Sequence, residues 1–177
     1  MSRFLEFVNT RHGFNFKDYW SLHDWSTKDL GAFWSSIWEF CEVMGTRYGS
    51  SYEEGRNFWE SQFFPESRLN FAENLIMRGK DSDVAVTGVD EFGKTINLTR
   101  LELRNQVEAV ASALRILGVQ SGDRVVAWSS NTVETIVFAL GALSIGAIVS
   151  TCSPDFASKA VIDRFGQIQP KVLLANP

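Results

Sequence analysis

The chain has 177 residues, of which 45% are hydrophobic and 13% aromatic, so it carries enough apolar material to bury a sizeable core. Its 17 Lys and Arg residues against 21 Asp and Glu give a net charge of -4, which provides no basic surface for a phosphate backbone and argues against a nucleic-acid partner. The longest apolar stretch, 136–149, is interrupted by Gly and Ser and is shorter than the roughly 20 residues that cross a bilayer, so we expect no membrane span.

The amino terminus and the two cysteines bear on the compartment. The run from Met1 to Glu6 reaches an acidic residue before any long apolar stretch, which differs from a secretory signal. Cys41 and Cys152 lie far apart without a second thiol near either, so neither a disulfide framework nor a zinc knuckle is expected. Both cysteines are expected to be reduced and buried, because free cysteine behaves as a small apolar side chain. We therefore expect a cytoplasmic protein.

Aromatic residues are concentrated in the first 80 positions, which hold five of the six Trp, all three Tyr and ten of the 14 Phe. The pair Ser26 and Asp29 predicts a helix start, because apolar side chains follow at helical spacing: Phe33, Trp34, Ile37, Trp38 and Cys41. A second helix is expected over about 51–62, ending before Pro65, since proline disfavours helix at the preceding residue. The aromatic stripe is interpreted as core. We expect an aromatic-rich helical cap over residues 1–80.

After this cap the period of the pattern changes. Apolar residues at 84–89 and 96–98, separated by Asp-Glu-Phe-Gly, predict a β-hairpin. Thr99 and Glu102 form a capping box, which predicts the start of a long amphipathic helix. That helix is expected to end at Gly118, which can adopt the left-handed conformation of a helix stop.

Strand and helix patterns then alternate to the end of the chain. Strands and helices are predicted in the order 124–128, 132–145, 147–151, 158–168 and 171–174. The strands are continuous apolar runs, which is typical of parallel strands covered on both faces. The predicted fold class is therefore α/β. Residues 81–177 are expected to form the hairpin and the first βαβαβ units of a doubly wound, mostly parallel sheet, which is an incomplete domain.

Residues 88–95 match the phosphate-loop pattern letter for letter, with two glycines separated by four residues and followed by Lys94 and Thr95. In a phosphate loop the Thr opens a helix, whereas Thr95 opens a strand-like run, and Asp90 and Glu91 would repel a phosphate. The segment is interpreted as the hairpin turn. His12 and His23, the only imidazoles, have no nucleophile or metal-ligand set around them in the sequence and are expected to be structural or exposed.

Two groups of segments resemble acyl-CoA synthetases over nearly the whole chain. The run 63–75 is similar to the FP-x-x-x-LN-x-AEN stretch that leads into the large domain of that family. The second group is more specific and comprises Gly122-Asp123-Arg124-Val125, Asn131, Glu134, Gly146-Ala147-Ile148, Ser153-Pro154-Asp155-Phe156 and the run 162–171. Acetate-activating members carry Phe-Gly-Gly-Phe where this chain has Ser-Pro-Asp-Phe, which favours the acetoacetate-activating branch.

The resemblance implies the amino-terminal part of an adenylate-forming ligase, in which acetoacetate and ATP, with Mg, give an acyl-adenylate before CoA displaces AMP. By position, Ser153, Pro154 and Asp155 would border the CoA adenine. Asp155 would repel a phosphate, so contact is expected with adenine or ribose. The family's Ser/Thr/Gly-rich phosphate loop, ribose-binding Asp and late catalytic Lys have no counterpart here. We therefore expect no catalytic residue, no metal site, no bound cofactor and no turnover from this chain alone.

Other hypotheses remain open. One alternative identity for the parent protein is another short-chain acyl-CoA synthetase. Independently of that choice, residues 153–155 are also interpretable as a loop and helix cap after a strand, without contact to CoA. A stand-alone nucleotide-binding module would use the run 88–95. A non-catalytic interaction domain would pair its exposed sheet edge with another copy.

Overall fold

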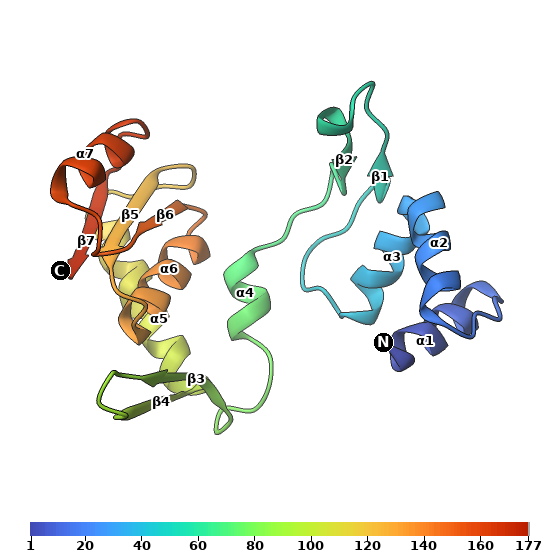
Figure 1. Cartoon of the computed structure of the whole chain (residues 1–177), viewed down its shortest axis with the longest axis horizontal. Coiled ribbons are helices and arrows are strands. Elements are labelled where there is room, and N and C mark those ends of the chain that lie inside the picture. The colour runs from blue at the N-terminus through green and yellow to red at the C-terminus, as the bar shows by residue number, and fades with distance from the viewer. Residues whose placement is uncertain (177) are drawn as a thin grey trace. The chain divides into compact units, whose positions relative to one another are not determined.

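The computed structural model describes residues 1–176, which divide into two compact units, 1–69 and 70–176 (Figure 1). The first unit contains three helices and a small hairpin: α1 (Ser2–His12), α2 (Tyr19–Lys28), α3 (Leu30–Phe40), β1 (Tyr52–Glu53), the 3-10 turn η1 (Phe58–Glu60) and β2 (Gln62–Phe63). Its buried core consists of Phe4, Val8 and Leu22, and aromatic side chains from all three helices pack around them. Phe33 and Ile37 of the predicted stripe pack against this core, whereas Trp34 is 38% exposed and Cys41 is exposed, so the core interpretation holds for part of the stripe only.

Two predictions in this unit are wrong, and two of its helices were not predicted. Asp29, not Ser26, starts α3, because Asp29 Oδ1 accepts the N–H of Ala32 at 2.9 Å while Ser26 lies inside α2. Helices α1 and α2 are missing from the sequence prediction, since α1 starts without a side-chain cap and α2 buries one apolar residue only, Leu22. Cys41 is exposed rather than buried because it follows the last turn of α3, whereas Cys152 is buried as predicted.

The helix predicted over 51–62 is also wrong, because this segment forms the β1–β2 hairpin, in which Tyr52 pairs with Phe63. Local hydrogen bonds replace the helical ones: the hydroxyl oxygen of Ser61 accepts the N–H of Gly55 at 3.1 Å. A Cβ added to Gly55 would lie 2.5 Å from the carbonyl carbon of Glu60, so the fold of this turn requires glycine there.

The second unit starts with a short helix and a hairpin, and then alternates helix and strand. Its elements are α4 (Phe71–Ile76), β3 (Val84–Val89), β4 (Thr95–Thr99), α5 (Arg100–Ile116), β5 (Arg124–Ser129), α6 (Val133–Ser144), β6 (Ile148–Cys152), α7 (Ser158–Gly166) and β7 (Val172–Asn176). The capping box is present, since the N–H of Thr99 donates to Glu102 Oε2 at 2.8 Å and the N–H of Glu102 donates to Thr99 Oγ1 at 3.2 Å. Gly118 has the left-handed φ of 80° that the helix stop requires.

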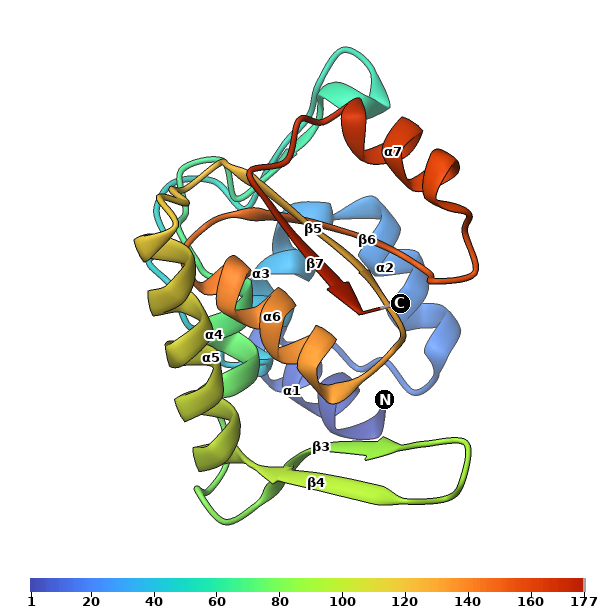
Figure 2. The same cartoon turned by 90° about the vertical axis from the view of Figure 1, so that its left-hand side faces the viewer.

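The sheet of this unit has three parallel strands in the order β6-β5-β7. Val125 in β5 pairs with Val149 on one side and with Val172 on the other. Figure 2 shows α5 and α6 on one side of the sheet and α7 on the other, and buried apolar clusters fill both layers. The chain passes from β5 to β6 through α6 and then returns across β5 to β7 through α7, so its direction along the sheet reverses. Such a reversal is how a doubly wound α/β sheet begins, as the sequence predicts. No helix within residues 1–176 is long and apolar enough to cross a bilayer.

Asn70 joins two helices of the second unit that are far apart in the sequence. Its Oδ1 accepts the N–H of Glu73 at 3.1 Å and so caps the start of α4. Its Nδ2 donates to the carbonyl oxygens of Leu143 at 3.0 Å and Ser144 at 3.2 Å, which lie at the end of α6. One side chain therefore hydrogen-bonds backbone groups at the start of α4 and at the end of α6.

Candidate ligand-binding edge of the sheet

The three parallel strands have their carboxyl-terminal ends on the same side of the sheet, and doubly wound proteins place their ligand loops at these ends. β5 leads through residues 130–132 into α6, and β6 leads through residues 153–157 into α7. A hollow of about 410 Å³ lies between these loops, and its lining includes Ser129, Asn131, Thr135, Thr151, Ser153 and Pro154. We refer to this hollow as the edge hollow, and it is the candidate binding site.

Hydroxyl side chains fix the loop after β5. Thr135 Oγ1 donates to the carbonyl oxygen of Ser130 at 2.9 Å, so the 2.8 Å contact with Ser129 is donated by Ser129 Oγ. Thr132 caps α6, since its Oγ1 accepts the N–H of Thr135 at 3.4 Å. The loop is thereby held in one arrangement before any ligand binds. Sequence reasoning missed this set, although hydroxyl residues between a strand and a helix start are a known capping signal.

The structure brings two of the three predicted site residues to the edge hollow. Ser153 and Pro154 line it, whereas Asp155 is exposed and lies outside the lining. Ser153 Oγ donates to Asp155 Oδ2 at 2.7 Å, and the N–H of Asp155 points back to Ser153 Oγ at 3.3 Å. The next residue, Phe156, anchors the loop: its ring packs beneath α7, and the guanidinium carbon of Arg164 lies 4.2 Å from its centroid.

The edge hollow is uncharged, and its lining mixes polar and apolar groups. Hydroxyls, the amide of Asn131 and the thiol of Cys152 lie beside apolar side chains such as Ile136 and Ala139, and none of these lining residues is Lys, Arg, His, Asp or Glu. Such groups hydrogen-bond a neutral base or sugar, but they neither neutralise phosphates nor hold Mg²⁺. Within the described part of the chain, no group of His, Cys, Asp and Glu has the arrangement of a metal site. The residues present therefore do not fit magnesium-bound ATP.

The segment that matches the phosphate-loop pattern is a hairpin turn, as predicted. Asp90 Oδ1 accepts the N–H groups of Phe92 at 2.9 Å and Lys94 at 2.8 Å, so a carboxylate already binds the amides that a phosphate would need. β4 begins directly after Lys94, where a phosphate loop would open a helix. The role of Gly88 is in packing, because a Cβ there would lie 2.6 Å from Cγ2 of Val133.

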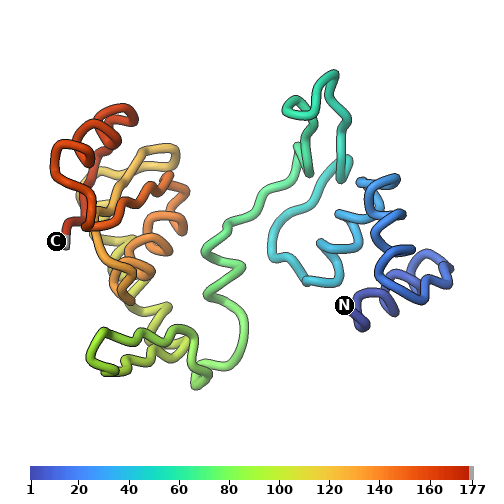
Figure 3. The backbone as a smooth tube through the Cα atoms, viewed as in Figure 1, coloured from blue at the N-terminus to red at the C-terminus, as the bar shows by residue number. Residues whose placement is uncertain are grey.

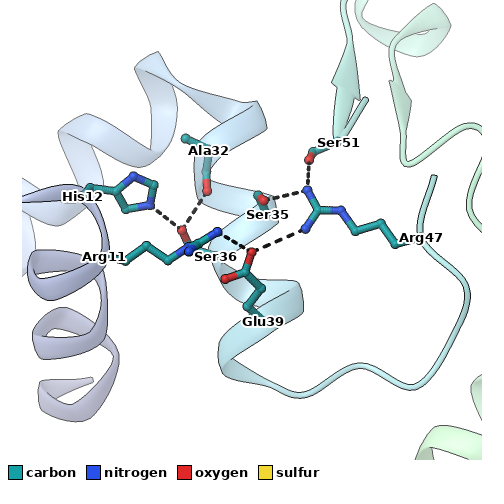
Figure 4. A network of polar contacts seen from close by, with 8 residues as sticks. All are labelled: Arg11, His12, Ala32, Ser35, Ser36, Glu39, Arg47 and Ser51. Atoms are coloured by element: carbon teal, nitrogen blue, oxygen red, sulfur yellow. Dashed lines mark hydrogen bonds and ion pairs between the residues drawn. The ribbon is translucent and has the colours of Figure 1, made fainter. Parts of the chain in front are cut away.

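His12 and Ser36 make a contact that resembles part of a catalytic pair (Figure 4). The distance between His12 Nε2 and Ser36 Oγ is 2.8 Å. Ser36 is completely buried and its hydroxyl donates to the carbonyl oxygen of Ala32 at 2.8 Å, so the imidazole N–H is the donor in this contact. A nucleophilic serine needs the reverse, with the imidazole accepting its proton. His12 is therefore structural, as predicted, and joins α1 to α3.

Other residues that carry the family resemblance lie at the amino-terminal ends of the strands, opposite the edge hollow. Lys171 Nζ donates to Asp123 Oδ2 at 2.8 Å, and Arg124 Nε donates to the carbonyl oxygen of Ile168 at 2.8 Å. The hydrogen bond from Lys171, with a second from the N–H of Gln120, lowers the pKa of Asp123 below its ordinary value. These residues hold the starts of β5 and β7 together and take no part in the edge hollow.

Residues 76–177, more than half of the chain, match the family model described as AMP-binding enzyme. The chain therefore belongs to the AMP-binding enzyme family. Within it, the chain is similar to acetoacetyl-CoA synthetases, as the resemblance implies. It is 43% identical to acetoacetyl-coenzyme A synthetase of Rhizobium meliloti (strain 1021), over 98% of this chain and 27% of that protein.

Two further comparisons define the region that is matched. The solved structure of acetoacetyl-CoA synthetase from Streptomyces lividans gives a TM-score of 0.90 at 34% identity, covering 98% of this chain and 27% of that one. Malonamoyl-CoA synthetase vrtB of Penicillium aethiopicum is 35% identical, over 99% of this chain and 25% of that protein. The chain spans about a quarter of the length of these relatives and corresponds to their amino-terminal part.

Proposed function

We propose that this chain is the amino-terminal part of a ligase that activates acetoacetate with ATP to an acyl-adenylate and transfers the acyl group to CoA. The observation that carries this proposal is the 43% identity with an acetoacetyl-coenzyme A synthetase along nearly the whole chain. The TM-score of 0.90 with a second acetoacetyl-CoA synthetase supports it. The assignment of residues 1–80 as a cap and 81–177 as the first part of the adenylation domain belongs to the same proposal, as does a cytoplasmic location.

In this proposal the chain contributes one neutral wall of the CoA site. Ser153 and Pro154 lie in the lining of the edge hollow, where hydroxyl and backbone groups suit the edge of an adenine or a ribose. Asp155 orients the hydroxyl of Ser153 through the 2.7 Å hydrogen bond and keeps its own charge outside the lining. The charged groups that hold ATP, Mg²⁺ and the CoA phosphates come from the remainder of the ligase, so residues 1–177 alone are inactive.

A second candidate is a ligase for a related short-chain acid. It is favoured by the 35% identity with a protein named malonamoyl-CoA synthetase, which is comparable to the 34% identity with the Streptomyces lividans enzyme. Malonamate and acetoacetate are both short acids with a second carbonyl group, so the residues that surround the acyl chain decide between them.

The test is pyrophosphate exchange by the full-length parent ligase that carries residues 1–177, with acetoacetate, malonamate and acetate supplied in turn. We expect the highest kcat/KM with acetoacetate. A preference for malonamate would replace the first candidate with the second, and exchange with none of the three acids would refute both.

A further inference from the structure

Asn131 follows the carboxyl end of β5 and lies in the lining of the edge hollow. Within residues 1–176 its side-chain amide forms no hydrogen bond, in contrast to the hydroxyls around it. The hydroxyls of Ser129, Thr132 and Thr135 all take part in hydrogen bonds within the loop and the first turn of α6. Asn131 is also exposed, so the oxygen and the nitrogen of its amide are both available to a ligand.

The backbone on both sides of Asn131 is held in place. The carbonyl oxygen of Ser130 accepts two hydrogen bonds, one from Thr135 Oγ1 and one from the N–H of Thr132, both at 2.9 Å. Thr132 is in turn the N-cap residue of α6. The amide of Asn131 is therefore presented from an ordered turn, and little backbone freedom is lost when a ligand binds to it.

The edge hollow also offers apolar surface to a flat ring. Ile136 and Ala139 lie three residues apart on one face of α6, and Pro154 contributes from the loop after β6. α6 and α7 cover opposite sides of the sheet, so the connections that lead into them diverge after β5 and β6, as Figure 3 traces. The edge hollow thus combines apolar contacts from two elements with one free amide, which is the usual composition of a small-molecule site.

A carboxamide matches one edge of adenine. Adenine presents two groups side by side, the N6 amino group, which donates, and the ring nitrogen N7, which accepts. The amide oxygen accepts and the amide nitrogen donates, so an asparagine side chain binds this edge with two hydrogen bonds. A purine with a carbonyl group at position 6 presents two acceptors instead, and the amide oxygen would then face another acceptor.

We propose that Asn131 recognises the adenine of CoA in the edge hollow through this pair of hydrogen bonds, which presupposes the proposed ligase function. The apolar side chains of Ile136 and Pro154 contact the faces of the base, and the uncharged lining suits a neutral ring. Asn131 thereby selects adenine among the purines. Thr135 is a positioning residue, because it acts only through the loop that carries Asn131.

Steady-state kinetics of the full-length parent ligase that carries residues 1–177 tests this inference. The acyl transfer step is measured with CoA and with deaminated CoA, in which hypoxanthine replaces adenine and a carbonyl group stands at position 6. The unchanged ligase should have a KM for deaminated CoA about five-fold or more above its KM for CoA, because a bidentate amide contact discriminates between bases to this extent. In Asn131→Ala the KM for CoA should rise and the two KM values should become equal.

The ratio of the two KM values distinguishes base recognition from other losses. A general loss of CoA affinity would raise both KM values and leave their ratio unchanged. Asn105→Ala is the matched control, because Asn105 is an exposed asparagine on α5 outside the lining, and this variant should keep the ratio of the unchanged ligase. Thr135→Val removes the hydroxyl that holds the carbonyl of Ser130 and should lower the ratio, whereas Thr135→Ser keeps a hydroxyl and should preserve it.

ATP carries the same base, so the first step of the reaction provides a second arm. Acetoacetate-dependent pyrophosphate exchange is measured with ATP and with inosine triphosphate, its hypoxanthine analogue. Asn131→Ala should show the same preference between these two nucleotides as the unchanged ligase. A preference that is lost in this arm, and not with CoA, would overturn the assignment of the base to CoA.

Two further outcomes would overturn recognition by Asn131. One is an unchanged ligase whose KM values for CoA and deaminated CoA are equal, and the other is a ratio that survives Asn131→Ala. Failure of the proposed function gives a different result, since exchange with acetoacetate would then be absent from the unchanged ligase before any variant is compared.

Discussion

Replacing Asn70 by alanine removes the hydrogen bonds that this residue makes to α4 and α6. The lost cap of α4 costs about 1 kcal/mol. The two lost bonds to the carbonyls of Leu143 and Ser144 contribute about 0.5–1.5 kcal/mol each. We therefore expect Asn70→Ala to lower the free energy of unfolding by about 2–4 kcal/mol.

Asn70→Asp separates the two functions of this side chain. A carboxylate still accepts the N–H of Glu73 and suits the start of α4, but at neutral pH it has no proton to donate to the end of α6. It faces two carbonyl oxygens, so its pKa should be raised in the folded chain. A raised folded pKa means that stability is gained as the pH falls and the carboxyl becomes protonated. Asn70→Asp should thus recover part of its lost stability in acid, whereas Asn70→Ala should not.

Urea unfolding followed by circular dichroism, repeated between pH 4 and pH 7, measures both effects. The matched control is Asn57→Ala in the first unit, where the side-chain amide donates to Glu60 Oε1 at 3.3 Å within the same turn and joins no second helix. Ordinary surface substitutions change the free energy of unfolding by less than about 0.5 kcal/mol. A loss that small for Asn70→Ala would contradict the prediction. So would an Asn70→Asp variant whose stability difference from the unchanged chain is the same at both pH values.

The remaining predictions concern packing, charge and the hairpin turn. Gly88→Ala should lower the free energy of unfolding by about 1–3 kcal/mol, because the added Cβ clashes with Val133. In a double-mutant cycle, adding Val133→Ala should restore part of that loss, and purely additive losses would contradict the packing role of Gly88. The hydrogen bond from Lys171 lowers the pKa of Asp123 in the folded chain. The ionised carboxylate therefore stabilises the fold fully above the ordinary pKa of 3.8, and this stabilisation is lost as the pH falls through the lower pKa of the folded chain. Asp123→Asn should lower the urea midpoint at pH 7 and flatten its acid dependence below pH 4, and an unchanged profile would contradict this. Lys94→Ala should leave calorimetric titration with magnesium-ATP unchanged, and an ATP affinity that depends on Lys94 would restore the phosphate-loop hypothesis.

The fold of the second unit could be predicted because its signals are local and repeated. The capping box at Thr99, the glycine stop at Gly118 and the continuous apolar strands each define an element from a few neighbouring residues. The first unit offers fewer such signals. The segment 51–62 was predicted as a helix, yet it forms the β1–β2 hairpin, because hydrogen bonds within the turn determine its conformation.

The candidate site could be predicted only in part. Ser153 and Pro154 were identified by resemblance, and the structure places both in the lining of the edge hollow. The hydroxyl network around Thr135 was not predicted, because Ser and Thr are common in loops and the network is visible only when β5 and α6 are placed together. The role of Asn70 was hidden for a similar reason, since its partner Leu143 lies 73 residues further along the chain.

We propose that these residues supply one neutral wall of a ligase site and require the remainder of the domain for chemistry. A chimera tests it directly: residues 1–177 replace the matched amino-terminal region of the Streptomyces lividans acetoacetyl-CoA synthetase, and acetoacetate-dependent pyrophosphate exchange is measured beside that of residues 1–177 alone. The chimera should catalyse exchange, and the isolated chain should not. Exchange by the isolated chain, or a folded chimera that binds ATP but cannot activate acetoacetate, would contradict it.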